Sequence, residues 1–533
     1  MRPSENARLP SYTTVLSLSG PRLFSHLNHL PTRLSPTNYK PETLMSFANH
    51  ASPVATSLRP SLVVIIGYYS VILLPILGYI WLANQQFVMK TTTSSWLHIL
   101  TAIQLLILLF PFANSMIALL GLLWFGPPKD LRPDSDWSWN PDFTLIVAYV
   151  SRGHQPETLN RATSQTLAVL DTLGVAYALE VVTDTPITED NQLRSTTGGT
   201  IYYFVVPPDY QTARHARYKA RALQYLLEQR IKRLSNTTGT CNTWVLHMDE
   251  ESIITPECVL GIHDHIHKYD LRSTRGAIGQ GEILYNSLNY GDNIWTTAID
   301  ASRTGGDLGQ FRMQYKALHK PLIGMHGSYV LTPEYVERDV TWDVGGHGSI
   351  TEDAYFALLA MERGVKFDWV EGFIREQSPF TAIDIIRQRR RWYCGLAQVS
   401  RDPALKLLTR FTLRVFVWFW TFTALALPLP LIYLQQRFIF GSGVLPYEVF
   451  LMGGTVTGFY AAVYSVGAYR NVLHCDLPLI KKVWIVCFSL ISWFFFVPAL
   501  VECAGTLYGL FSPVSTFYVV AKDSRRQQDG TTP

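Results

Sequence analysis

Three short polar groups have the residue types and spacing to do chemistry, and the first is the acidic triplet Asp249-Glu250-Glu251. In an extended chain Asp249 and Glu251 point to the same side. Their carboxylate oxygens are the ligands that Mg²⁺ and Mn²⁺ prefer. The pair can therefore hold a divalent metal that neutralises a diphosphate leaving group. The alternative is an N-terminal cap for the helix expected from Pro256, where acidic residues are favoured.

The second group is Thr351-Glu352-Asp353, which follows a glycine-rich stretch at 345–348. The Asp353 carboxylate could accept the proton of an attacking hydroxyl if its pKa lies near the working pH. Thr351 could instead cap a helix, with Glu352 and Asp353 complementing the helix dipole. Capping and catalysis are compatible, so both interpretations stay open.

The third group is Gln388-Arg389-Arg390-Arg391-Trp392, within a segment at 379–398 that mixes aliphatic, aromatic and basic residues. This composition predicts a helix in the membrane interface, with its basic face toward phosphates. A helix that only anchors the protein is the alternative. Gln388, Arg391 and Trp392 are the candidates for contact with a substrate.

Long apolar runs flank these groups. The runs at 62–83, 97–125, 415–434 and 449–469 carry no charge and are long enough to cross a hydrocarbon layer of ~30 Å. A fifth run, 483–511, contains Pro498 and Glu502, and a carboxylate is costly inside a span. We expect four crossings and a broken or re-entrant fifth run; five crossings are the alternative.

Composition and charge define the class of protein. The 533 residues are 48% hydrophobic and 13% aromatic, enough for a catalytic core and several spans. A net charge of +4 is too small to suggest a nucleic-acid partner. The six cysteines form no CxxC pair, which fits a reducing compartment. Basic residues after the second and fourth runs predict a cytosolic middle domain, and Lys522, Arg525 and Arg526 predict a cytosolic C-terminus.

Between the second and third runs, strand-like and helix-like segments alternate, which predicts an α/β domain with a parallel sheet covered by helices on both faces. Ligands bind beyond the carboxyl ends of such strands. Ser151, Arg152, Asp184 and the acidic triplet lie there. The strands are expected at 144–150, 177–183, 200–206, 243–247 and 322–332, and the helices at 157–173, 212–234, 256–269 and 352–363.

These features divide the chain into successive regions. Residues 1–58 are rich in Ser, Pro and Thr and are expected to be disordered. The remaining regions are two membrane helices at 59–125, the catalytic domain at 126–378, the interfacial helix at 379–400, C-terminal membrane helices at 411–511, and a cytosolic loop and tail at 512–533.

The order of motifs resembles the family 2 glycosyltransferases, which include cellulose, chitin and hyaluronan synthases. Gln388 to Trp392 matches their QxxRW signature and Thr351 to Asp353 their TED motif, while Asp249 and Glu251 stand at their DxD motif. Residues 219–223 resemble the lysine-containing segment before that motif, and residues 517–522 resemble the FxVTxK gating loop. Glu251 replaces the usual second Asp, and the gating motif also departs from the pattern. The resemblance implies an α/β GT-A (Rossmann-like) catalytic domain.

A narrower resemblance, to the egghead-type β-1,4-mannosyltransferases, covers most of the chain beyond residue 60 and includes the segments at 247–252, 342–353 and 371–380. It implies GDP-mannose as donor, glucosylceramide as acceptor, an inverting transfer that depends on Mn²⁺ or Mg²⁺, and an endoplasmic reticulum or Golgi membrane. A processive polysaccharide synthase, or a glycolipid transferase that uses a UDP-sugar, is the alternative.

The same resemblance implies roles for the candidate residues. Asp353 would be the catalytic base, and Asp249 and Glu251 would bind the metal. Glu352, His347 and Trp392 would contact the acceptor. The donor would be bound by Ser151, Arg152, Asp184, Lys219, Asp249, Gln388, Arg391 and Trp392.

Overall fold

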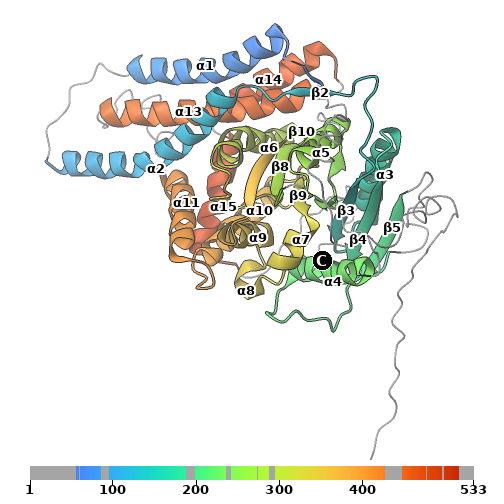
Figure 1. Ribbon diagram of the computed structural model, residues 1–533. Helices are drawn as coiled ribbons and strands as arrows, with labels where there is room; N and C mark the ends of the chain where they lie inside the picture. Colours follow the sequence, from blue (N-terminus) through green and yellow to red (C-terminus); the bar gives the residue numbers. More distant parts are fainter. Residues whose placement is uncertain are drawn as a thin grey trace, which may run out of the picture.

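The structure is a computed structural model that describes residues 56–58, 60–85, 95–187, 199–235, 242–272, 274–286, 294–426, 447–475, 477–494 and 497–514. An α/β domain forms one part of the molecule, and long helices form the other (Figure 1). Of the segment at 1–58 that was expected to be disordered, residues 1–55 lie outside the described residues, and so does the gating-like segment at 517–522. The last three residues of that segment, Thr56–Leu58, form the short strand β1.

The α/β domain is built on an eight-stranded sheet with the order β5-β4-β3-β6-β9-β8-β10-β7. Parallel pairing joins β5 to β4, β4 to β3, β3 to β6 and β8 to β10, whereas β9 and β7 run antiparallel to their neighbours. The strands are β3 (Phe143–Ser151), β4 (Tyr177–Thr183), β5 (Thr200–Val205), β6 (Asn242–Asp249), β7 (Ile253–Ile254), β8 (Ala277–Leu284), β9 (Val330–Pro333) and β10 (Lys366–Arg375).

Alternate residues of β3 enter two cores on opposite faces of the sheet. Leu145, Val147 and Tyr149 pack in one core with α3 (Pro156–Thr172) and α5 (Pro256–Lys268). Ile146, Ala148 and Val150 pack in the other with α4 (Tyr218–Leu234), α7 (Glu334–Val340) and α9 (Glu352–Glu362). The period of two residues in the strand thus produces a sheet with helices on both faces.

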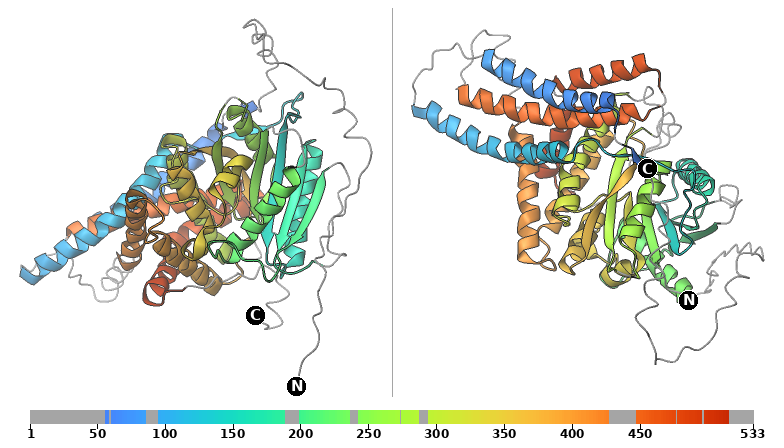
Figure 2. Two further views of the ribbon diagram at one scale, coloured as in Figure 1. Left: turned by 60° about the horizontal axis from the view of Figure 1, so that its bottom comes forward. Right: turned by 45° about the horizontal axis from the view of Figure 1, so that its top comes forward.

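Long helices continue the second core. The apolar runs before and after the α/β domain form α1 (Leu62–Gln85), α2 (Ser95–Phe125), α11 (Leu407–Ala426) and α13 (Tyr447–Leu473). Helices α1 and α2 both pack against α13 and extend with it away from the α/β domain (Figure 2). Within α1 and α2, Leu62–Trp81 and Ala102–Phe125 are long and apolar enough to cross a membrane.

The fifth apolar run contains two helices, α14 (Leu479–Phe494) and α15 (Val497–Phe511), with Pro498 and Glu502 in the second. Helix α15 packs against α10 (Ala382–Val399), which carries the Gln388 to Trp392 group. Whether α14 or α15 crosses a bilayer stays a prediction.

The expected strands and helices differ from the structure in four places. The helix expected at 212–234 begins only at Tyr218. The sheet is mixed, not wholly parallel, because β9 inserts antiparallel between β6 and β8. The strand expected at 322–332 pairs only as Val330–Pro333. Strands β8 and β10 were not predicted. The remaining described elements are the β1 (Thr56–Leu58) and β2 (Asp130–Arg132) pair, α6 (Ile294–Gly306) with π-helical turns at Asp307–Phe311 and Met313–Ala317, and α8 (Gly345–Gly348).

Candidate active site

A cavity of about 380 Å³ lies where the carboxyl ends of β3, β4 and β6 meet α9 and α10. The strand register pairs Ser151 with Thr183 and Val150 with Asp249, so the three strand ends lie side by side. The lining also includes Phe416 and Trp420 of α11 and Tyr464 of α13. The cavity therefore extends from the sheet to two of the long apolar helices.

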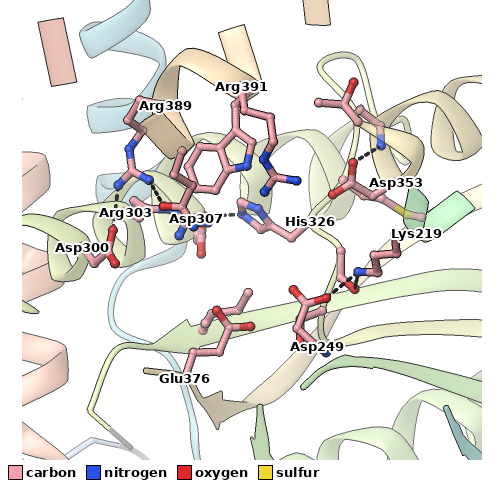
Figure 3. A pocket seen from close by; sticks show the side chains of 18 of the residues that line it. Lys219, Asp249, Asp300, Arg303, Asp307, His326, Asp353, Glu376, Arg389 and Arg391 are labelled. Atoms are coloured by element: carbon pink, nitrogen blue, oxygen red, sulfur yellow. Dashed lines mark hydrogen bonds and ion pairs between the residues drawn. The ribbon is translucent and has the colours of Figure 1, made fainter. Parts of the chain in front are cut away.

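Lys219 joins the first two polar groups inside this cavity (Figure 3). Its ammonium group forms an ion pair with Asp249, lies 3.6 Å from a Glu352 oxygen and donates to the Gly327 carbonyl at 3.2 Å. Burial lowers the pKa of Lys219, but the Asp249 and Glu352 carboxylates outweigh that effect and hold the pKa above its usual range. Lys219 is therefore charged and neutralises part of an acidic cluster.

The Glu352 and Asp353 carboxyls are shifted in the direction that a proton acceptor needs. Burial and the neighbouring Asp353 charge raise the pKa of Glu352 to about 7, although Lys219 opposes the shift. Burial also raises the pKa of Asp353, against the effect of Lys219. Thr351 occupies the N-cap position of α9 but its side chain makes no capping hydrogen bond. The arrangement suits proton transfer near neutral pH.

The sequence argument assumed that the acidic triplet is extended, but in the structure it is not. Strand β6 ends at Asp249, and Glu250 and Glu251 lie in the following turn. All three residues still line the cavity. Glu250 accepts a hydrogen bond from Ser151 and another from Gln155 Nε2 at 3.2 Å, so the middle acid fixes the loop after β3.

Arg389 attaches helix α10 to the neighbouring helices. The Arg389 guanidinium donates to Asp300 of α6 at 2.7 Å, to Glu502 of α15 at 2.7 Å and to the neighbouring Gln388 at 2.7 Å. This network gives the carboxylate of Glu502 a buried cationic partner. The predicted interfacial helix would turn its arginines toward phosphates, whereas Arg389 points into the protein and pairs with carboxylates.

The structure brings almost every candidate from the sequence to this one cavity. Lining residues include Ser151, Arg152, Asp184, Lys219, Asp249, Glu251, Glu352, Asp353, Gln388, Arg391 and Trp392. Asp184 is also paired with Arg221 at 2.8 Å. His347 is the exception, because it lies exposed on α8 and is not among the lining residues.

Sequence reasoning missed a second set of polar groups on the side of the cavity formed by α6. His326 Nε2 lies 2.7 Å from Asp307 Oδ1, and Arg303 also lines the cavity (Figure 3). These residues match no motif that the sequence analysis used. The one available signal was Met325-His326-Gly327-Ser328, a polar interruption in the apolar run at 322–332.

The acidic residues are suited to a divalent metal that shares its ligands with a substrate. Asp249 and Glu251 both line the cavity beside Asp353 and offer hard carboxylate oxygens. Among the described residues no group of three or more His, Cys, Asp or Glu side chains forms a complete metal cage. Mg²⁺ is commonly bound by one or two carboxylates and by substrate phosphates, without such a cage.

Comparison with known proteins defines the class. Residues 244–502 match the family described as Glycosyl transferase family group 2. The β-1,4-mannosyltransferase bre-3 of Caenorhabditis elegans is 33% identical over 361 residues, covering 65% of this chain and 71% of the relative. The β-1,4-mannosyltransferase egh of Drosophila melanogaster is 32% identical over 386 residues, covering 72% of this chain and 78% of the relative.

These matches establish a glycosyltransferase of family 2. More narrowly, the chain belongs to the β-1,4-mannosyltransferases represented by bre-3 and egh. Among solved structures, a mannosyltransferase from Pyrobaculum calidifontis in complex with GDP-Man and Mn²⁺ matches with 12% identity and a TM-score of 0.40, covering 78% of this chain and all of that one. The assignment rests on the two sequence relatives.

Proposed function

We propose that this enzyme transfers mannose from GDP-mannose to the 4-hydroxyl of the glucose in glucosylceramide. The product would be β-1,4-mannosyl-glucosylceramide. The observation that carries the proposal is the extent of the cavity, from Asp249 at the end of β6 to Trp420 of α11. A polar donor can occupy the sheet end while a lipid-linked acceptor enters from the apolar helices.

Cationic and acidic groups at the sheet end support a nucleoside diphosphate donor. Arg152, Lys219 and Arg391 are cations that line the cavity there, and Asp184 and Ser151 lie at neighbouring strand ends. When Mn²⁺ or Mg²⁺ is bound, Asp249 and Glu251 would hold it, and it would neutralise charge on the leaving diphosphate. Gln388 and Arg391 are proposed to orient the same diphosphate.

Asp353 is the proposed base. Its raised pKa and its place beside Glu352 suit removal of the proton from the acceptor hydroxyl as that oxygen attacks the anomeric carbon. Attack from the face opposite the diphosphate would invert an α-linked donor to a β-linked product. Glu352 and Trp392 would position the acceptor sugar.

The placement is proposed to be a multi-pass membrane of the endoplasmic reticulum or Golgi with the catalytic domain in the cytosol. Arg470, in the last turn of α13, forms a buried ion pair with Glu282 of β8, with N···O distances of 2.8 and 3.0 Å. This pair ties the sheet to the end of α13 that carries the positive charge. A cytosolic α/β domain agrees with that attachment.

One assay tests the proposal. Detergent-purified protein with Mn²⁺ and glucosylceramide would be given GDP-mannose, UDP-glucose, UDP-GlcNAc or GDP-glucose, and products would be resolved by mass and by linkage analysis. We expect one hexose, β-1,4-linked, from GDP-mannose alone. A ladder of hexoses, or turnover only with a UDP-sugar, would contradict it and favour a polysaccharide synthase or another glycolipid transferase.

A further inference from the structure

Two guanidinium groups lie against the indole ring of Trp392, and they differ in what else they contact. Arg389 Cζ is 4.4 Å from the ring centroid and Arg303 Cζ is 4.3 Å from it. Arg389 also bonds to the carboxylates of Asp300 and Glu502. Arg303 has no hydrogen bond or ion pair within the described part of the chain.

Arg303 is nevertheless held in place. Besides Trp392, its guanidinium stacks on the ring of Tyr285, with Cζ 4.8 Å from the centroid. These ring contacts hold the guanidinium without a hydrogen bond to an oxygen or nitrogen acceptor, so its N–H groups can donate to a ligand. A half-buried planar donor that is already ordered binds a ligand with little further loss of side-chain entropy. Arg303 therefore has the geometry of a group that donates hydrogen bonds into the cavity.

The charges around Arg303 indicate what it can bind. Asp300 and Glu502 pair with Arg389, and Asp307 pairs with His326, so carboxylates outnumber guanidiniums at this end of the cavity. These carboxylates disfavour a second anionic ligand in addition to the donor diphosphate. A neutral ligand with several hydroxyl oxygens can accept hydrogen bonds from Arg303 without that penalty.

Position narrows the ligand further. Arg303 lies on the α6 side of the cavity, across from the Lys219–Asp249 pair where the diphosphate is proposed to bind (Figure 3). Phe416, Trp420 and Tyr464 of the long helices line the same cavity. A sugar attached to a lipid would reach the cavity from those helices.

We propose that Arg303 is a specificity-determining residue that hydrogen-bonds to hydroxyl oxygens of the acceptor sugar, while contacts with the rings of Trp392 and Tyr285 hold its guanidinium in place. The assignment rests on the proposed transfer from GDP-mannose to a lipid-linked glucose. It adds a residue from α6, outside every motif identified in the sequence.

The first test is the kinetics of Arg303→Lys with GDP-mannose and glucosylceramide. Lysine keeps the charge but loses the planar fork, so we expect kcat/KM for the acceptor to fall about 10- to 100-fold. The KM for GDP-mannose should stay within about twofold. Arg233→Lys is a control for the loss of a guanidinium over a tyrosine, because Arg233 lies 3.9 Å from the ring centroid of Tyr202 and pairs with Glu180 but does not line the cavity.

The second test uses octyl glucosides that lack the 2-, 3- or 6-hydroxyl. Deleting the hydroxyl that Arg303 contacts should lower the wild-type kcat/KM for the acceptor about tenfold or more. The same deletion should leave the kcat/KM of Arg303→Lys unchanged. If Arg303→Lys does not fold, as judged by its melting temperature, Arg303→Gln replaces it. A fully additive effect of every deletion would overturn the assignment.

The two proposals fail in different ways. Wild-type protein that adds no hexose from GDP-mannose overturns the proposed function and this assignment with it. Wild-type protein that transfers mannose, with an Arg303 variant that keeps the wild-type kcat/KM for the acceptor, overturns the role of Arg303 alone. A variant that changes only the KM for GDP-mannose would move Arg303 to the donor site and also contradict the proposal.

Discussion

At the scale of single residues, the adjacent acids of α9 have environments that separate them from ordinary surface carboxyls. Glu352 and Asp353 are raised in pKa by burial, and the charge of Asp353 acts on Glu352 as well. A base must be deprotonated to work, so a raised pKa moves the acid limb of the rate profile toward neutral pH.

The first prediction concerns that acid limb. Because the Lys219 charge lowers the pKa of Asp353, Lys219→Met should raise that pKa, and the acid limb of kcat should move about one unit to higher pH. The measurement is mannosyl transfer between pH 5 and 9. Asp353→Asn serves as the reference, with kcat reduced about 10²- to 10⁴-fold at every pH. An unchanged limb, or one moved to lower pH, would contradict this effect of Lys219.

A second prediction concerns Gly327, which borders the same cluster. An added Cβ would lie 2.8 Å from Lys219 Nζ and 3.2 Å from Asp353 Oδ2. Gly327→Ala should therefore displace these side chains and lower kcat about tenfold or more, with little change in melting temperature because only side-chain ends must move. Gly346→Ala is the control, since its Cβ would meet nothing within 4 Å. Equal activities of both variants would rule out a cluster that depends on this close approach.

At the scale of elements, Arg389 makes α10, α6 and α15 one unit. Its three contacts leave from different nitrogens of one guanidinium, a geometry that lysine cannot reproduce. The buried charges are compensated only while all three helices keep their positions.

The third prediction follows from this geometry. Arg389→Lys should lose about 1.5–3 kcal/mol of stability through its broken charged hydrogen bonds. The melting temperature in detergent, with transfer activity measured in parallel, would show the loss as a drop of several degrees. Arg390→Lys is the control from the same helix. Arg390 makes exposed hydrogen bonds to Ser512 and lies over the ring of Tyr508, but pairs with no buried carboxylate among the described residues. A drop of similar size in both variants would count against a special role for Arg389.

The element scale also shows what the sequence could and could not predict. The strands at β3, β4, β5 and β6 were found because β-branched, aromatic and aliphatic residues predominate in them and no glycine interrupts them. Strand β8 was hidden by Gly281, which lies against the ring of Tyr329, and by Glu282, whose partner Arg470 is distant in the chain. In β10, Gly372 has a positive φ and approaches the Glu257 carbonyl. Long-range contacts of this kind leave no local pattern.

The site was easier to predict than the sheet, but only where a motif exists. Asp249, Asp353 and Trp392 were proposed from short patterns, and all three line the cavity. Arg303 belongs to no such pattern, because its proposed role depends on the rings of Tyr285 and Trp392, which only the fold brings to it. Chain order cannot reveal such a convergence.

At the scale of the whole molecule, the long helices and the sheet share one hydrophobic core. Tyr68 of α1, Leu122 of α2 and Val466 of α13 belong to the same cluster as Ile146 of β3. The catalytic domain is therefore packed directly on the helices, so its position relative to a membrane is fixed by their orientation.

The fourth prediction is that the catalytic domain and the C-terminus lie on the same, cytosolic side. A C-terminal epitope tag in sealed microsomes should be removed by added protease, while a lumenal marker protein stays intact. Protection of the tag would refute four crossings with a re-entrant fifth run. Glycan on Asn236, which lies outside the described residues, would reverse the whole orientation.

The ion pair between Lys219 and Asp249 gives the enzyme a counterion of its own. Proteins whose acidic cages depend on a metal to offset their repulsion unfold when a chelator removes it. Here a lysine already offsets part of that repulsion, so we expect the fold not to depend on bound metal. EDTA should abolish transfer yet leave the melting temperature nearly unchanged, and added Mn²⁺ should restore full turnover. The enzyme would thus survive periods of metal scarcity intact and resume work without being synthesised again.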